Sequence, residues 1–148
     1  MIDLFEKILL LKNSDIFEQI STDDLRFVAD ALDEQLYLKG DTVFEENDRG
    51  DNMYVIVSGE VGIALGKDKN NFIATMSAGE CFGEMNLLDE LPRSASAIVT
   101  QDATVLKLSQ PKLRGLIMSY PELGLGMLKS VSLKLRKTSK MIQNHVSN

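Results

Sequence analysis

Residues 82–96 read FGEMNLLDELPRSAS and interrupt a series of short apolar segments in the middle of the chain. Gly83 opens an expected helical turn there, and the unpaired N–H groups and positive dipole of such a turn can hold an anion. Arg93 supplies a planar, permanently charged fork suited to phosphate, and Ser94 supplies a hydroxyl donor. Glu84 supplies carboxylate oxygens that can accept a hydrogen bond from a sugar hydroxyl. This combination predicts a small pocket for a ribose joined to a phosphate.

Two of these residues also have an ordinary structural interpretation. Arg93 could be a surface ion-pair partner of Asp89 or Glu90, and Glu84 could be a charge at a helix N-terminus. For either residue alone, that interpretation would be the better one. Their joint occurrence at this spacing favours ligand binding.

The segments on both sides of residues 82–96 have the pattern of short β-strands. From Gln35 to Leu108, runs rich in β-branched and aromatic residues alternate with turn signals containing Gly, Asn and Asp. The expected runs include residues 53–57, 61–65, 96–100 and 104–108. Strands recurring at this rate predict a sandwich or barrel rather than a parallel sheet.

The 148 residues, 44% apolar and 26% charged, have the length and balance of one globular domain. Apolar residues recur at helical spacing in residues 2–12, and Ser21 followed by Asp24 is a helix-start signal. Pro111 and Pro121 stand where the first turn of a helix tolerates proline. We expect N-terminal helices in residues 1–33, a barrel in 34–109 and C-terminal helices in 110–148.

The last expected helix carries a regular apolar stripe. Its members are Leu128, Val131, Leu135, Thr138 and Ile142, at spacings of three and four. Such a seam is typical of a coiled coil, which favours a homodimer formed through residues 121–146. The alternative is that the stripe docks on the barrel of its own chain.

Charge and cysteine content limit the partners and the location. The net charge of −6 predicts repulsion of nucleic acid and of anionic membranes. Basic residues do gather near the C-terminus, but such a run is more often a solvated helix flank, so no DNA binding is expected. No apolar run is long enough to cross a membrane, and the N-terminus lacks the basic region of a secretory signal. The one cysteine, Cys81, cannot form an internal disulfide, which indicates the cytoplasm.

Residues for catalysis or metal binding are sparse. The one histidine, His145, is expected at a solvated helix end, and Cys81 is expected to be a small core residue. Neither has a partner at the spacing of a catalytic triad, a metal site or a P-loop. The sequence therefore predicts no enzyme, no metal and no cofactor.

The 82–96 segment resembles the phosphate-binding cassette of the cyclic-nucleotide-binding domain family, as in the catabolite activator protein and protein kinase A regulatory subunits. The matching residues are Phe82-Gly83-Glu84-Met85 and Pro92-Arg93-Ser94-Ala95, and the likeness extends over roughly residues 14 to 145. It implies a mainly β fold: an eight-stranded jelly-roll β-barrel (double-stranded β-helix) with short N-terminal helices, a cassette helix and a long C-terminal helix. It also implies a regulatory domain in signal transduction.

The resemblance assigns roles to individual residues. Glu84 would accept a hydrogen bond from the ribose 2′-hydroxyl, and Arg93 would pair with the exocyclic phosphate oxygens. Ser94 would donate to the phosphate, as would backbone N–H groups near Gly83, Glu84 and Ala95.

This chain departs from the family pattern at four positions of the cassette. Met85 replaces a usual leucine, a volume-conserving change. Asn86 stands where a small residue is common and could alter the cassette helix. Asp89 and Glu90 would weaken anion binding if they pointed inward, and we expect them to be exposed.

The base is less strongly specified than the phosphate. Ser94 follows the arginine as in cAMP-binding relatives, although its hydroxyl could serve either purine. Thr138 and Ser139 resemble a Thr-Ser pair that contacts adenine, the serine coming from the other subunit. We therefore expect cAMP rather than cGMP, bound by a sensor that switches its C-terminal helix and an effector. The alternative is a degenerate domain that binds nothing and serves as a dimerisation scaffold, and whether the chain is part of a longer protein stays open.

Overall fold

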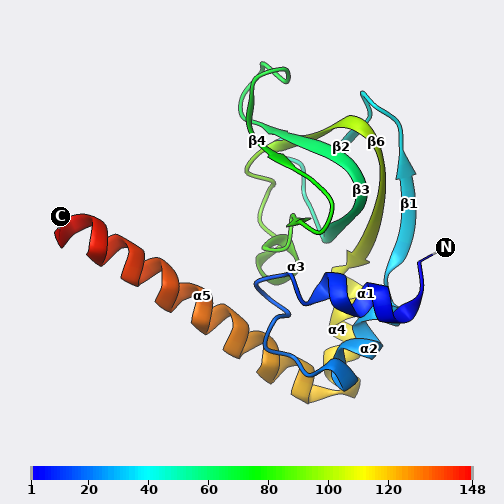
Figure 1. Ribbon diagram of the computed structural model, residues 1–148, viewed down its shortest axis with the longest axis vertical. Coiled ribbons are helices and arrows are strands. Elements are labelled where there is room, and N and C mark those ends of the chain that lie inside the picture. The colour runs from blue at the N-terminus through cyan, green and yellow to red at the C-terminus, as the bar shows by residue number, and fades with distance from the viewer. Residues whose placement is uncertain (1, 148) are drawn as a thin grey trace.

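The structure, a computed structural model, describes residues 2–147 and the side chains of residues 2–145. A rolled antiparallel sheet stands on a layer of helices, and one long helix leaves that layer (Figure 1). The helices are α1 (Leu4–Leu11), α2 (Thr22–Asp30), α3 (Asn86–Asp89), α4 (Gln110–Ser119) and α5 (Pro121–Ser147). The strands are β1 (Asp33–Tyr37), β2 (Thr42–Phe44), β3 (Asn52–Ala64), β4 (Phe72–Met76), β5 (Cys81–Phe82) and β6 (Ser96–Ser109).

The sheet runs in the order β1-β6-β3-β4, with β2 paired to β6 and β5 paired to β3, all antiparallel. The mainly β architecture with flanking helices is therefore confirmed. Instead of the eight strands expected, the described residues form six, because two expected pairs are continuous. β3 (Asn52–Ala64) joins the expected runs 53–57 and 61–65, ending one residue early, and β6 spans both 96–100 and 104–108.

Gly59 explains why β3 continues through a sequence that signals a turn. Its φ is +93°, and a Cβ there would overlap the backbone of Asp102 and Ala103. The register between β3 and β6 shifts on both sides of Ser58. These bulges bend the strand sharply without ending its pairing, so the sheet curls while remaining one ladder.

Helix ends follow the signals in the sequence. The Ser21 hydroxyl accepts a hydrogen bond from the Asp24 N–H at 3.2 Å, which caps α2. Ser109 caps α4 in the same way, with Pro111 in the first turn, and α5 begins at Pro121. Two apolar clusters result, one between the helices and the sheet and one inside the barrel.

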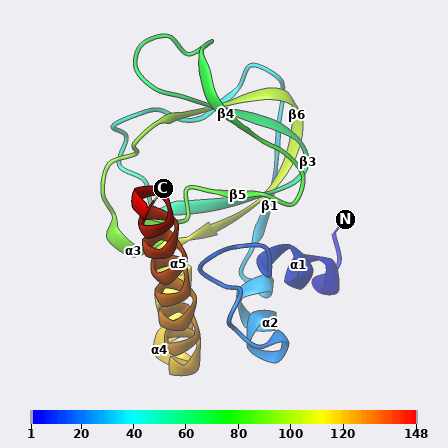
Figure 2. The same ribbon diagram turned by 60° about the vertical axis from the view of Figure 1, so that its left-hand side comes forward.

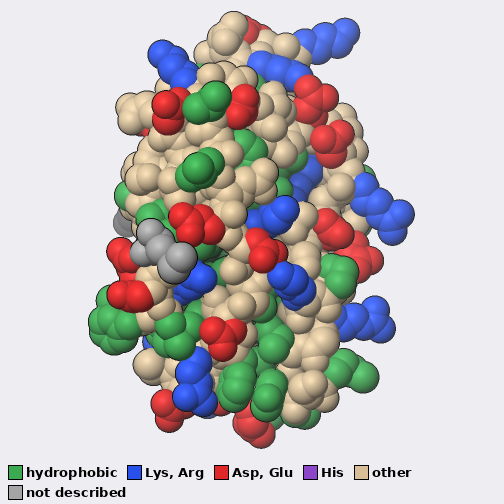
Figure 3. Space-filling model, turned by 90° about the vertical axis from the view of Figure 1, so that its right-hand side faces the viewer, with side chains coloured by type: hydrophobic (Ala, Val, Ile, Leu, Met, Phe, Trp, Pro, Cys, Tyr) green, Lys and Arg blue, Asp and Glu red, His purple; other side chains and the backbone are tan. Residues whose placement is uncertain are grey.

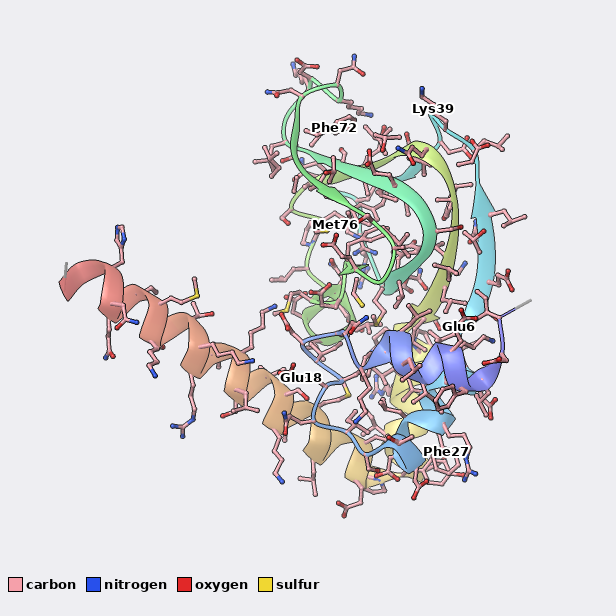
Figure 4. All side chains as sticks on the ribbon, in the orientation of Figure 1. Glu6, Glu18, Phe27, Lys39, Phe72 and Met76 are labelled. Atoms are coloured by element: carbon pink, nitrogen blue, oxygen red, sulfur yellow. The ribbon has the colours of Figure 1, made fainter. Side chains whose placement is uncertain are left out.

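Helix α5 is packed at its start and exposed along its second half. Leu123 and Met127 are buried in the cluster between helices and sheet. The Ser130 hydroxyl accepts a hydrogen bond from the Gln19 N–H at 3.0 Å, and Lys134 pairs with Asp15 at 3.5 Å. Glu18 lies beside this part of the helix, whereas later side chains project into open space (Figure 4).

The expected stripe on α5 is not the face that packs. Val131 contacts the apolar cluster, but Leu128, Leu135 and Ile142 are exposed. The stripe is therefore not docked on the barrel of its own chain. The homodimer remains a prediction.

Candidate functional site

A cavity of about 260 Å³ opens where the 82–96 cassette meets the barrel. All six residues that the sequence assigned to the cassette site line it, namely Gly83, Glu84, Met85, Arg93, Ser94 and Ala95. The barrel adds the side chains of Phe44, Ile63 and Met76. The cavity thus has polar groups on the cassette side and an apolar wall on the barrel side.

Two left-handed residues shape the cassette. Gly83 has a φ of +75° and turns the chain from β5 into the single turn of α3, while Glu90 at +56° ends that turn. The buried Leu87 anchors the turn in the apolar cluster. Among the described residues, the N–H groups of Gly83, Glu84 and Ala95 donate no hydrogen bond, so they remain free for a ligand.

Arg93 is the dominant electrostatic feature of the cavity. Its side chain is 3% exposed and lies over the Phe44 ring, 4.0 Å from the centroid. Nη1 donates to Asn86 Oδ1 at 2.8 Å and to the Gly83 carbonyl at 3.3 Å, and Nη2 donates to the Asn52 carbonyl at 2.7 Å. All three acceptors are neutral, and Nε has no partner within the described residues.

The guanidinium therefore carries a buried charge without a counter-ion. No ion pair joins Arg93 to a carboxylate in the part of the chain that the structure describes. Asp89 and Glu90 are exposed, as expected. Because Arg93 is buried and pairs with neither of them within the described residues, the surface ion-pair interpretation of Arg93 is wrong. Burial lowers the pKa of Arg93, with a smaller opposite effect from Tyr54, Asp51 and Asp48. A buried cation with a spare donor favours binding of an anion.

Backbone of two segments, residues 50–52 and Gly83, closes around this side chain. A Cβ at Gly50 would overlap the Arg93 guanidinium at Nε, and a Cβ at Gly83 would lie 2.5 Å from Nη1. The position of Gly50 was missed in the sequence, where it stands inside a run of turn residues. The Asn52 carbonyl was also missed because backbone acceptors carry no residue-specific signal.

The remaining cassette side chains are open to a ligand. Glu84 is half-buried at the cavity, and its carboxylate makes no hydrogen bond or ion pair with another described residue. Ser94 is exposed at the rim, and Met85 is 46% exposed. A carboxylate acceptor and a hydroxyl donor thus flank the buried arginine, which suits a ligand with both hydroxyl and anionic groups.

Cys81 lines the same cavity, but its thiol is unreactive. Burial raises the pKa of its thiol to about 12, and the nearby Glu84 adds to this. The thiol therefore stays protonated and unreactive near neutral pH. Among the described residues, no three His, Cys, Asp or Glu side chains gather as a metal site.

Thr138 and Ser139 lie elsewhere. Both are on the exposed second half of α5, and neither lines the cassette cavity. Figure 1 shows α5 extending away from the sheet and from α3 toward its C-terminal end, and in Figure 2 most of the helix lies below the sheet. Their contact with a base stays a prediction.

Surface properties add two observations. On the face that carries α1 and β1, acidic and basic side chains are interspersed rather than separated by sign (Figure 3). Within the described residues, no helix combines the length and apolar character needed to span a bilayer.

Known proteins resemble this chain in sequence and structure. The model of the family described as "Cyclic nucleotide-binding domain" matches residues 34–120. The chain is 30% identical over 130 residues to a cyclic AMP receptor protein of Thermus thermophilus, covering 86% of this chain and 60% of that protein. It is 27% identical over 132 residues to a CRP-like cAMP-activated global transcriptional regulator of Mycobacterium tuberculosis, covering 88% and 59%.

A solved structure matches nearly from end to end. The N-terminal domain of a transcriptional regulator from Streptomyces coelicolor superposes with a TM-score of 0.81 and 27% identity, covering 90% of this chain and 94% of that one. The chain spans only about three fifths of the two bacterial regulators named above. The family model covers the strands and residues 82–96, and the solved structure shares the overall fold. This chain belongs to the cyclic nucleotide-binding domain family.

Proposed function

We propose that this chain is a regulatory sensor that binds 3′,5′-cyclic AMP in the cassette cavity, and cyclic GMP more weakly, and catalyses no reaction. The proposal rests on the environment of Arg93, whose guanidinium is buried, has only neutral acceptors and leaves Nε without a partner within the described residues. A cyclic phosphate supplies the missing negative charge. The free N–H groups of Gly83, Glu84 and Ala95 and the Ser94 hydroxyl provide further donors to it.

The ribose and the base follow from the walls of the cavity. Glu84 is a free acceptor beside the cassette turn and suits the 2′-hydroxyl. The apolar wall of Ile63 and Met76 suits the flat face of a purine. The preference for adenine rests on Thr138 and Ser139 and on the names of the relatives, which include a cyclic AMP receptor protein.

Switching would act through α5. In the structure its second half is unpacked, so ligand binding could recruit that half over the base at little cost in broken contacts. Hydrogen exchange of residues 121–146 should slow when the ligand is added. Unchanged exchange at saturating ligand would contradict this step.

We further propose a homodimer through residues 121–146, with the exposed Leu128, Leu135 and Ile142 at the interface. Sedimentation of the purified chain tests it, since a monomer at all concentrations would refute it. We place the protein in the cytoplasm, because its one cysteine is unpaired. The effector is a further domain or a partner protein rather than DNA bound by this chain.

Calorimetric titration with cAMP and then cGMP tests the central proposal. We expect tight cAMP binding, and Arg93→Ala should weaken it about 100-fold or more because a desolvated charge contact is lost. Arg114→Ala, which removes an exposed arginine of α4, is the matched control and should bind as the wild type does.

Other outcomes of the titration are equally informative. Equal binding of cAMP and cGMP would retain the site and refute the base preference. Binding of neither nucleotide by the folded wild-type chain would refute the sensor and leave the dimerisation scaffold.

A further inference from the structure

The contact between Asn86 and Arg93 joins the start of α3 to the arginine that faces the cavity. Asn86 is 9% exposed, and its Oδ1 accepts the shorter of the two hydrogen bonds that Arg93 Nη1 donates, at 2.8 Å. Its Nδ2 donates to the carbonyl of Leu91 on the other side. The amide therefore has both ends occupied, which fixes its orientation between the helical turn and the loop before Arg93.

The chemical nature of this contact is as informative as its geometry. An aspartate has the same shape as Asn86 and would bring a carboxylate to the same nitrogen, forming a buried ion pair. An alanine would leave Nη1 with only the longer bond to the Gly83 carbonyl, at 3.3 Å. Of these three side chains, only the amide both binds Nη1 and leaves the charge of the guanidinium uncompensated.

We propose that Asn86 is a positioning residue of the anion site: it holds Arg93 through Nη1 and keeps the arginine charge available to the ligand phosphate. This inference rests on the proposed function and adds to it a residue that acts only through Arg93. It also gives a reason for an amide at a position where a smaller side chain would fit the turn.

The proposal predicts an unusual order of variants. If Asn86 only filled space, Asn86→Ala would be the more damaging change, since aspartate keeps the shape. The hydrogen bond to the Leu91 carbonyl is lost in both variants, because neither side chain has a donor, so it does not separate the two cases. Under the proposal Asn86→Asp is the worse binder, because its carboxylate competes with the phosphate for Arg93. In Asn86→Asp the new ion pair with Arg93 and the lost hydrogen bond to the Leu91 carbonyl act on stability in opposite directions, so thermal unfolding serves to show that the variant is folded.

Calorimetry with cAMP measures the first part. We expect Asn86→Asp to bind about 10- to 100-fold more weakly than the wild type, the loss of one or two charge-assisted hydrogen bonds. Asn86→Ala should lose less. Gln110→Glu is the matched control, since it adds one negative charge at the start of α4 without a hydrogen bond to Arg93. Wild-type affinity in Asn86→Asp, or a greater loss in Asn86→Ala, would overturn the proposal.

Nitrogen NMR of the arginine side chain in the ligand-free protein measures the second part. A held guanidinium gives separate Nη1 and Nη2 resonances, assigned to Arg93 by their loss in Arg93→Ala. Asn86→Ala should merge them through faster rotation, and Asn86→Asp should keep them apart. Separate resonances in Asn86→Ala would overturn the positioning role. This readout needs no ligand, so it decides the role of Asn86 even if the wild-type chain fails to bind nucleotide, which would refute the proposed function instead.

Discussion

The cassette and the second half of α5 were both expected to contact the ligand, and they differ in how the fold holds them. In the cassette, Arg93 is buried and held by three carbonyl or amide oxygens from two segments. On α5, Thr138 and Ser139 are exposed, and within the described side chains no ion pair to the rest of the chain lies beyond that of Lys137 with Glu18. The cassette arginine is fixed by contacts within the fold, whereas the second half of α5 is largely exposed.

This difference has an energetic meaning. Side chains that are already ordered in the folded protein lose little further conformational entropy when a ligand binds. Their contacts therefore contribute almost fully to affinity. A helix that becomes ordered over the ligand only on binding loses conformational entropy, and this loss offsets part of the free energy that its contacts contribute. The phosphate contacts should therefore dominate affinity, and the α5 contacts should decide specificity and signalling.

The largest expected effect locates the boundary between packed and free parts of α5. Leu123→Ala removes a fully buried side chain and should lower the free energy of unfolding by about 3 kcal/mol. Leu135→Ala removes a side chain that is 64% exposed and should change it by less than about 0.5 kcal/mol. Chemical denaturation at concentrations that keep the chain monomeric measures both. A comparable cost at Leu135 would show that the second half of α5 is packed after all.

The next effect concerns the pre-assembly of the cassette. Gly83→Ala forces an L-residue to a φ of +75° with its Cβ 2.5 Å from Arg93 Nη1. The backbone cost alone is about 1–2 kcal/mol, and displacement of Arg93 should weaken cAMP binding about tenfold or more. Denaturation and calorimetry measure the two parts.

Gly115→Ala in α4 is the control for Gly83→Ala. Its Cβ would meet no atom within 4 Å, so the change should stabilise the chain by roughly 0.5–1 kcal/mol. If Gly83→Ala kept wild-type affinity, the cassette would not depend on the close approach of its backbone to the arginine.

The smallest expected effect tests the free region. The double change Thr138→Ala and Ser139→Ala should weaken cAMP binding about three- to tenfold, the value of one neutral hydrogen bond, and leave unfolding unchanged. Affinity for cGMP should change less, so the ratio of the cAMP affinity to the cGMP affinity should fall. Ser132→Ala, also exposed on α5, is the control. An unchanged ratio of the two affinities would show that these residues do not read the base.

Local patterns in the sequence were sufficient for the strands, the helix starts and the cassette residues. Runs rich in β-branched and aromatic residues between turn signals predicted the strands, and Ser21 and Pro121 marked helix starts that the structure confirms. The six cassette residues converge on one cavity because they are close in the chain and joined by a single tight turn. The joining of two strand pairs was not predicted, because Gly59 signals a turn as readily as a bulge.

Only the tertiary structure decided which groups surround Arg93. Phe44, Gly50 and Asn52 come from strands and loops more than forty residues before Arg93. A local sequence pattern does not show which distant segments come together in the fold. Burial without a counter-ion also arises only from packing, since the nearby Asp89 and Glu90 made a surface ion pair the simpler interpretation. The sequence by itself determined a sandwich or barrel of strands from local residue patterns, and its resemblance to a known family implied the jelly-roll fold and the roles of the cassette residues. The three-dimensional packing decided that the arginine is a buried, uncompensated charge, because desolvation and long-range contacts are properties of the folded chain.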